Sequence, residues 1–284
     1  MNYRHIYHAG NFADVFKHVI LARLVAYLKR KDAAFRVIDT HAGAGLYDLA
    51  SEEAQKTGEW RSGIGRLLDA AVADGPAGLL RDYLDMVRAL NPDGGIRRYP
   101  GSPWLVRHLL RRQDRLTAIE LHPRDAKTLK ELFAGDHQVR VIELDGWLSL
   151  GAHVPPKEKR GLVLIDPPFE EEGEFDRMVA GLNTACRRWP GGVYAFWYPV
   201  KDRAAVGRFR QALADTGIPK ILDVSMTIRA PSAEPRLDGC GMAIVNPPFV
   251  LGEELTEILP LLTRRLGEDR NAAWSLDHLA GEAA

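Results

Sequence analysis

The chain of 284 residues has only two cysteines, Cys186 and Cys240, and their separation matches no metal-binding spacing. We therefore expect buried, reduced thiols rather than a disulfide framework. No apolar run approaches the roughly 20 residues that a membrane-spanning helix needs. The N-terminal segment also lacks the apolar core of a signal peptide. These absences predict a soluble, cytoplasmic protein with no membrane partner.

The chain also lacks an excess of charge, because Lys plus Arg and Asp plus Glu both number 38. The net charge of zero therefore provides no overall attraction to a polyanion, and a nucleic-acid ligand would require positive charge gathered on one face. Four basic clusters could supply such a face beside a binding crevice, or could be ordinary solvated surface. They are Arg97-Arg98, Arg107 to Arg115, Lys157-Lys159-Arg160 and Lys201-Arg203.

The order of predicted elements indicates one large α/β domain, and the apolar content of 46% suffices for its core. Helical spacing covers residues 12–29, with Asn11 as N-cap, and a buried strand covers residues 34–39. Farther along, predicted strands cover 116–120, 139–143, 161–166, 193–197, 220–228 and 241–245, and helices cover 123–133, 174–187, 202–215 and 253–266. This alternation predicts a mostly parallel, seven-stranded sheet with helices on both faces.

Residues 47–99 interrupt this alternation. They are rich in Ala and Leu, are broken by Gly75-Pro76 and Asn91-Pro92, and show no obvious strand. We interpret them as a small helical insertion in a core formed by residues 1–46 and 100–284. A helix over 104–112 should follow, with Ser102 as its cap and Pro103 in its first turn. The last dozen residues are expected to be loosely ordered. The absence of a heptad pattern or an exposed apolar stripe favours a monomer.

Polar residues end four successive predicted strands: the turn Asp39-Thr-His-Ala-Gly-Ala-Gly45, then Glu120, Asp145 and Asp166. In a doubly wound sheet these ends meet at one crevice. Gly43 and Gly45 would allow a ligand to approach closely, Glu120 could accept both ribose hydroxyls, and Asp145 could accept from an adenine amino group. The pattern favours an adenosine-containing cofactor, although a glycine turn alone can be purely structural. NAD is disfavoured, because the third glycine of its fingerprint is missing and Glu120 comes too late.

Asp166-Pro167-Pro168-Phe169 is typical of a site that binds an amino group. The lone pair of adenine N6 is delocalised into the ring, so N6 attacks a sulfonium methyl group only when acceptors hold its N–H groups. The Asp166 carboxylate and the Pro167 carbonyl can be these acceptors, and the proline ring makes the turn rigid. Phe169 can stack on a base taken out of its helix. Orientation and electrostatics suffice for an in-line transfer, without a metal or a covalent intermediate. The alternative is that these residues form only a structural turn at the end of a strand.

Asn246-Pro247-Pro248-Phe249 has the same form and could also accept from an amino group. The strand before Asp166 should lie beside the first strand, whereas Asn246 ends the last predicted strand. We therefore favour Asp166 as the acceptor. Use of Asn246 would instead favour a protein glutamine as the substrate.

The chain resembles the RlmJ family, the bacterial 23S ribosomal RNA adenine-N6 methyltransferases, nearly from end to end. The shared motifs are Tyr3-Arg4-His5, His8-Ala9-Gly10-Asn11, Ala13-Asp14-Val15 with Lys17-His18, Asp39 to Gly45, Tyr99-Pro-Gly-Ser-Pro103, Glu120-Leu-His-Pro123, Asp166-Pro-Pro168 and Trp197-Tyr-Pro199. The resemblance implies a class I, Rossmann-like methyltransferase with a helical insertion. One departure is Phe169, where the family usually has tyrosine; stacking survives this change, but a phenol hydrogen bond does not.

The resemblance also implies site residues and partners. S-adenosylmethionine would contact His18, His41, Ser102, Glu120, Asp145, Gly146 and Asp166. Asp166 would be the catalytic acceptor, Tyr3 would meet the RNA, and His5 and Lys17 would belong to the same substrate-binding motif. The partner would be naked or early-assembly 23S ribosomal RNA. Adenine in DNA is the rival substrate, and a nucleic-acid-binding protein with a vestigial site is the rival class. The histidines match no catalytic zinc pattern, so no metal is expected.

Overall fold

The computed structural model describes residues 4–68, 76–232 and 236–281. Tyr3, predicted to meet the RNA, lies outside these residues. None of the helices in the described ranges combines the length and apolar character needed to cross a bilayer.

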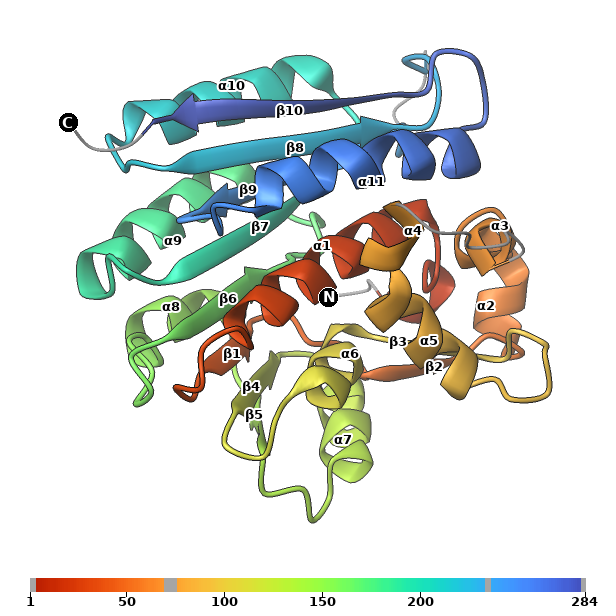
Figure 1. Ribbon diagram of the computed structural model, residues 1–284, viewed down its shortest axis with the longest axis horizontal. Coiled ribbons are helices and arrows are strands. Elements are labelled where there is room, and N and C mark those ends of the chain that lie inside the picture. The colour runs from red at the N-terminus through yellow and green to blue at the C-terminus, as the bar shows by residue number, and fades with distance from the viewer. Residues whose placement is uncertain (1–3, 69–75, 233–235, 282–284) are drawn as a thin grey trace.

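One large sheet forms the centre of the molecule, in the order β5-β4-β1-β6-β7-β9-β8-β10 (Figure 1). Its strands are β1 (Arg36–Asp39), β4 (Arg115–Glu120), β5 (Val139–Glu143), β6 (Gly161–Ile165), β7 (Val193–Val200), β8 (Ile221–Thr227), β9 (Gly239–Val245) and β10 (Ala273–Ala280). The five strands from β5 to β7 are parallel, whereas β9, β8 and β10 continue the sheet in antiparallel pairs. The predicted α/β class is confirmed, with eight strands in this sheet instead of seven.

Strand β10 corrects the expectation of a loosely ordered C-terminus. Residues 273–280 pair with β8 along its whole length, and the Ser225 and Ser275 hydroxyls hydrogen-bond at 2.9 Å. The strand lies at the edge of the sheet, and its residues are half-buried or exposed. Because neither face is fully buried, the segment lacks the apolar alternation by which a strand is detected in a sequence.

Helices cover both faces of the sheet (Figure 1). One core contains residues of α1 (Phe12–Leu28), α6 (Ser102–Leu109), α7 (Pro123–Leu132) and α11 (Leu251–Leu266). The core on the other face contains residues of α8 (Gly146–Ala152), α9 (Glu174–Arg188) and α10 (Arg203–Asp215). These bounds agree with most of the predicted helices.

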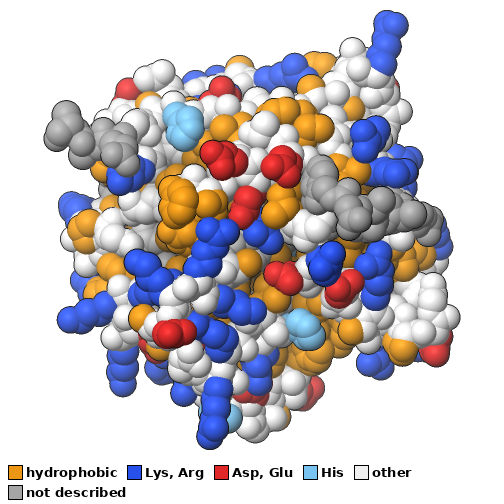
Figure 2. Space-filling view, in the orientation of Figure 1, with side chains coloured by type: hydrophobic (Ala, Val, Ile, Leu, Met, Phe, Trp, Pro, Cys, Tyr) orange, Lys and Arg blue, Asp and Glu red, His pale blue; other side chains and the backbone are white. Residues whose placement is uncertain are grey.

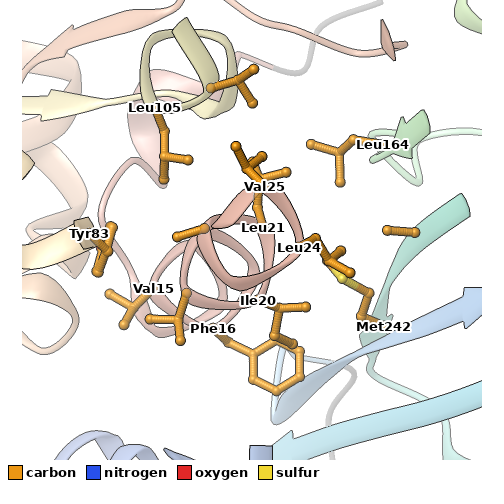
Figure 3. Packing of buried hydrophobic residues seen from close by; sticks show 14 of the residues in the cluster. Val15, Phe16, Ile20, Leu21, Leu24, Val25, Tyr83, Leu105, Leu164 and Met242 are labelled. Carbon is orange, nitrogen blue, oxygen red and sulfur yellow. The ribbon is translucent and has the colours of Figure 1, made fainter. Parts of the chain in front are cut away.

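Helix α1 is buried around its whole circumference, since 14 of its 17 residues are buried. Figure 3 shows Leu24 directed toward Met242 of β9, while Val15 faces the side of Tyr83, which belongs to the insertion. Asn11 caps the helix as predicted, because its side chain accepts from Asp14 N at 2.9 Å. Helix α1 therefore lies between the sheet and the insertion and packs against both.

Residues 47–99, which we propose form an insertion, contain α2 (Glu52–Thr57), the 3-10 helix η2 (Glu59–Arg61), α3 (Ile64–Leu68), α4 (Pro76–Leu79) and α5 (Arg81–Ala89). The prediction that it has no strand is wrong. At its base, β2 (Leu46–Asp48) pairs with β3 (Arg98–Pro100) in an antiparallel ribbon. Strands of three residues are too short to show alternation, so the sequence gives no sign of them. Buried residues of α5 belong to the same core as α1.

The start of α6 also differs from the prediction. Gly101, not Ser102, is the N-cap residue, and no side chain caps the helix. The backbone N–H of Gly101 donates to Gly45 O at 2.8 Å, which fixes where the chain enters the helix. Ser102 is therefore the first helical residue, is buried, and faces the carboxyl edge of the sheet.

Replacing Phe16 by alanine tests the importance of α1. Phe16 is fully buried, and its loss would leave a cavity, so the free energy of unfolding should fall by about 3–5 kcal/mol. Denaturant unfolding measures this change. The control is Leu148→Ala on α8, because Leu148 is 61% exposed and its change should cost at most about 0.5 kcal/mol. Equal costs for the two substitutions would contradict the central position of α1.

Candidate active site

A cavity of about 860 Å³ opens at the carboxyl ends of the parallel strands. The N-terminal segment, α1 and the insertion complete its wall. Twelve predicted site residues line it: His5, Lys17, His18, His41, Gly43, Ser102, Glu120, Asp145, Gly146, Asp166, Pro167 and Phe169. Gly45 does not line it. The fold therefore brings together predicted site residues that are distant in the sequence.

The two glycines of the first turn have different roles. Gly43 has φ +62 and lines the cavity, and its N–H donates to Glu120 Oε2 at 2.8 Å. Gly45 has φ +83, and a Cβ there would come within 2.7 Å of Leu129 and Leu132. A side chain at Gly45 would be both strained and crowded. Gly45 thus allows α7 to pack against the turn, rather than allowing a ligand to approach.

Glu120 at the end of β4 is held by two backbone donors. Besides the Gly43 N–H, it accepts the N–H of His122 at 2.7 Å. Burial raises the pKa of Glu120, while these two hydrogen bonds oppose the shift. Each carboxylate oxygen has further acceptor capacity, and Glu120 lines the cavity, so it can accept from two adjacent hydroxyls.

Asp145 and Gly146 form the next part of the wall. The Asp145 side chain caps α8 by accepting from Trp147 N at 2.9 Å. A Cβ on Gly146 would lie 2.3 Å from Thr40 O and 2.8 Å from the His41 ring. The backbone of α8 can approach the first turn only because residue 146 has no side chain.

His18 is buried at the boundary between the cavity and the insertion. Its Nδ1 hydrogen-bonds to the Tyr99 hydroxyl at 2.9 Å, and that hydroxyl hydrogen-bonds to the Tyr83 hydroxyl at 3.0 Å. Burial lowers the pKa of His18 to about 3, so the ring is neutral at pH 7. Among the described residues, His18 Nε2 has no hydrogen-bond partner. A ligand in the cavity could provide one.

Asp39 is a second buried polar group behind this wall. It is fully buried at the end of β1, and neither carboxylate oxygen has a hydrogen bond of good geometry to another described residue. Burial raises its pKa to about 7, against the opposing effect of the nearby Ser102 hydroxyl. Buried polar groups are normally hydrogen-bonded, so these oxygens indicate a place where a polar ligand or water completes the structure.

A chain of charged groups leads to Asp166. Lys17 Nζ lies 2.5 Å from Asp166 Oδ2 and 2.9 Å from Asp14 Oδ1, and Asp14 Oδ2 lies 2.8 Å from His5 Nε2. Although burial opposes charge on Lys17, the two carboxylates hold its pKa well above the usual value. Asp14 is also buried, yet His5 and Lys17 hold its pKa well below the usual value. Lys17 is therefore a buried cation that fixes the orientation of the Asp166 carboxylate.

Phe169 lies in an aromatic corner beside Asp166. Its ring forms edge contacts with Phe175, at a centroid distance of 5.1 Å, and with Trp197, at 6.2 Å. Its φ of +52 is in the left-handed region, which is unusual for a bulky residue. A strained conformation beside a cavity is a common feature of functional sites. Pro167, Phe169 and Trp197 all line the cavity.

The competing Asn246 does not line this cavity. It follows β9, which runs antiparallel to β7, so Asn246 comes after the pair Val245 and Tyr194 near the start of β7. Its amide donates to Pro190 O and Gly192 O at 2.8 Å each. Asn246 is therefore at the end of the sheet opposite the cavity, where it joins the loop after β9 to the loop before β7.

The predicted basic clusters do not gather around the cavity. Lys201 lines it, but the residues of the clusters at 107–115 and 157–160 do not. The segments 111–114 and 157–160 precede β4 and β6, and therefore lie at the opposite edge. Arg97 is exposed on the insertion and faces Asp48 at 3.6 Å. The idea of one continuous basic track beside the cavity is wrong, because loops that precede parallel strands cannot lie at their carboxyl ends.

Sequence reasoning assigned no role to several residues around the site. Asp14 was part of a motif only, although its i,i+3 spacing to Lys17 on a predicted helix was a usable sign of an ion pair. The Tyr47 ring packs at a tilt against the His5 ring, with centroids 5.2 Å apart, and the Tyr83 hydroxyl hydrogen-bonds to the Tyr99 hydroxyl. Glu59 of the insertion accepts from Asn11 at 2.9 Å. No local pattern reveals these tertiary contacts.

A family model described as ribosomal RNA large subunit methyltransferase D, RlmJ, matches residues 32–280. The chain belongs to the RlmJ family. Two relatives carry the name ribosomal RNA large subunit methyltransferase J. The protein of Haemophilus influenzae is 41% identical over 283 residues, which cover 99% of this chain and 100% of the relative. The protein of Escherichia coli is 42% identical over 266 residues, which cover 94% of each.

A solved structure has the same fold over nearly the whole chain. A crystal structure of a Legionella pneumophila protein has a TM-score of 0.88 and 32% identity to this chain, and the match covers 95% of this chain and 98% of that one. The mostly parallel sheet, in a chain of this methyltransferase family, is the Rossmann-like fold of class I methyltransferases that the resemblance implied.

Gly146→Ala should weaken binding of the RlmJ-family methyl donor, S-adenosylmethionine, because the new methyl group would collide with Thr40 O and the His41 ring. We expect at least about a tenfold rise in Kd, equivalent to about 1.4 kcal/mol, by isothermal titration calorimetry. Gly151→Ala is the matched control in the same helix, since a Cβ there meets nothing within 4 Å. Unchanged affinity in the Gly146 variant would contradict the close approach of α8.

The pKa of His18 predicts a pH dependence of stability. Because its pKa in the folded state is about 3, and the unfolded value is about 6.5, the unfolded state binds the proton first. This contribution to the free energy of unfolding is present above about pH 6.5 and is lost progressively as the pH falls toward 3. His18→Gln should therefore flatten the pH dependence between 6.5 and 4 in denaturant titrations. Parallel curves for the two proteins would contradict the buried neutral state.

Proposed function

We propose that the chain transfers a methyl group from S-adenosylmethionine to the exocyclic N6 of an adenine in 23S ribosomal RNA. The observation that carries this proposal is the position of Asp166-Pro167-Pro168-Phe169 in the wall of the cavity, at the end of β6 and beside the predicted cofactor residues. Membership of the RlmJ family, and the printed names of its two relatives, support ribosomal RNA as the substrate class.

The residues present fit the cofactor. Glu120 offers acceptors to adjacent ribose hydroxyls, Asp145 with Gly146 offers acceptor and backbone groups to an adenine, and His41 lies against Trp147 at a centroid distance of 5.5 Å. Within the described residues, His18 Nε2 in the cavity wall lacks a hydrogen-bond partner, which supports a polar ligand beside it. Bound S-adenosylmethionine supplies an electrophilic methyl group on its sulfonium.

Asp166 would act on the nucleophile. Its carboxylate can accept an N6–H of the target adenine, and the Pro167 carbonyl can accept the other, so that the N6 lone pair is directed at the methyl group. Lys17 Nζ donates a hydrogen bond to Asp166 Oδ2 at 2.5 Å, and this contact keeps the carboxylate in place. As N6 forms its bond to the methyl group, the S–CH3 bond breaks and the sulfonium would become a neutral thioether. N6 gains positive charge, which the negative Asp166 stabilises until the N6 proton passes to water.

Phe169 and Trp197 would hold the base. Both rings line the cavity next to Asp166, and an adenine taken out of its helix can stack on an aromatic side chain. The tyrosine to phenylalanine change at residue 169 leaves this surface intact. His5 lies at the same wall, and this position supports a contact with nucleotides next to the target adenine.

Asp166→Asn tests the assignment of the acceptor. The variant should bind S-adenosylmethionine but transfer methyl groups at least about a hundredfold more slowly, because the charge that stabilises N6 is lost. Asp93→Asn, the same change at an exposed carboxylate of the insertion, is the matched control and should leave the rate unchanged. Equal rates for Asp166→Asn and the wild type would overturn the role of Asp166.

The substrate is tested by incubation with tritiated S-adenosylmethionine. Unmodified 23S ribosomal RNA, duplex DNA and a protein extract are offered separately, and labelled nucleic acid is digested to nucleosides. Label in N6-methyladenosine from the ribosomal RNA is expected. Label confined to DNA or to protein would show that the methyl acceptor is not RNA and would contradict the proposed substrate.

A further inference from the structure

Positive charge gathers at the amino ends of the parallel strands, on the side of the sheet opposite the cavity. The segments 29–32, 111–115 and 157–160, here called the basic edge, contain nine Lys or Arg and three Asp or Glu, in a chain whose total charge is zero. They follow α1, α6 and α8 and come before or at the starts of β1, β4 and β6. Figure 2 shows Lys and Arg side chains gathered at the lower left, near the end of α1 in Figure 1.

The basic edge is a built surface rather than a set of loose loops. Arg111 donates to Lys31 O at 2.9 Å, and Arg160 donates to Ala33 O at 2.8 Å. Both guanidinium groups lie over the Phe35 ring, at 5.6 and 5.8 Å from its centroid. These arginines join the three segments through backbone carbonyls, so the edge has a fixed shape.

Other cations of the basic edge point to solvent. Lys31, Arg112, Lys157 and Lys159 are exposed. In the described ranges, none of the four has an ion-pair partner, in contrast to Arg36, which is paired with Glu158 at 2.8 Å. Unpaired cations at fixed positions are suited to bind successive phosphates of a nucleic-acid strand.

An exposed aromatic side chain lies beside these cations. Phe249, in the Asn246-Pro-Pro-Phe turn, is 82% exposed. Its ring forms an edge contact with Tyr27, at 5.9 Å, and the Arg30 guanidinium lies 5.5 Å from the Tyr27 centroid. Aromatic rings next to cations are the combination that binds unpaired bases by stacking and their phosphates by charge.

The cavity itself has the opposite balance of charge. Its lining contains ten Asp or Glu and five Lys or Arg. An acidic opening suits an extruded base but repels the phosphates around it, so the phosphate contacts that dominate nucleic-acid affinity have to come from elsewhere on the protein.

We propose that the basic edge, with Phe249 and Tyr27, is a second RNA-binding surface that holds a single-stranded segment of the RNA whose adenine enters the cavity. The inference rests on the proposed function, since it assigns a further contact to the same substrate. A strand of six residues separates the two edges by roughly 20 Å. The substrate is therefore RNA that reaches both edges, with its unpaired segment at Phe249.

Binding of a fluorescein-labelled oligouridylate, measured by fluorescence anisotropy over a salt series, tests this surface. Phe249→Ala should weaken binding roughly 5- to 100-fold, because a stacked base is lost, whereas Phe249→Trp should bind like the wild type. Lys31→Ala and Lys159→Ala should each lower the slope of log Kd against log salt concentration by about 0.7, the value for one phosphate contact with a single strand.

Leu148→Ala and Lys127→Ala are the matched controls, since they remove an exposed apolar side chain and an exposed cation elsewhere. Both should bind like the wild type, and thermal unfolding should show that all variants are folded. Unchanged affinity in Phe249→Ala and Lys31→Ala would overturn the proposal and would favour a protein partner as the contact of the exposed Phe249 ring. An equal loss in the controls would also overturn it.

The probe separates this proposal from the proposed function. Oligouridylate contains no adenine, so its binding does not depend on which group is methylated. A wild-type protein that methylates 23S ribosomal RNA but does not bind oligouridylate would refute the second surface alone. A protein that binds oligouridylate through Phe249 but labels only DNA would keep the surface and refute the proposed substrate.

Discussion

The burial of α1 on all sides is the constraint on which the rest of the structure depends. A helix with no exposed residue and 14 of its 17 residues buried cannot shift or rotate without opening the core on both the sheet side and the insertion side. Its first turns therefore hold Asp14, Lys17 and His18 at fixed positions in the cavity wall. The insertion stabilises the same arrangement from outside, through the hydrogen bonds that join Tyr83, Tyr99 and His18.

This rigidity matters because α1 buries an ion pair, which is costly unless the geometry is good. Lys17 lies between two carboxylates, and Asp14 is further satisfied by His5 and by the N–H of Gly10 at 2.9 Å. Removing one partner would leave another charge buried without compensation. The N-terminal segment is thus part of the electrostatic balance of the site as well as part of its wall.

The sequence predicted the parts of the molecule that have a local signature. Alternation of strands and helices indicated the parallel sheet, and polar residues at strand ends indicated the cavity, because strand direction brings those ends together. Strand β10 and the ribbon of β2 and β3 were missed, since an exposed edge and three-residue strands show no periodicity. Ser102 was assigned as a cap because residue type alone does not show that Gly101 is tied to Gly45. In the network around Asp14, only the i,i+3 pair with Lys17 has a local signature, whereas the contacts of Lys17 with Asp166 and of Asp14 with His5 depend on the tertiary fold.

The two Pro-Pro-Phe turns show what a motif leaves out. Asp166 and Asn246 follow strands of the same sheet, but β9 runs antiparallel to β7 and so also to β6, and the two turns point to opposite sides of the molecule. In one turn the aromatic ring packs against Phe175 and Trp197; in the other it is open to solvent. The direction of the preceding strand thus decides at which end of the sheet such a tetrapeptide lies. A search for the motif in the sequence alone treats the two turns as equivalent, although they lie at opposite ends.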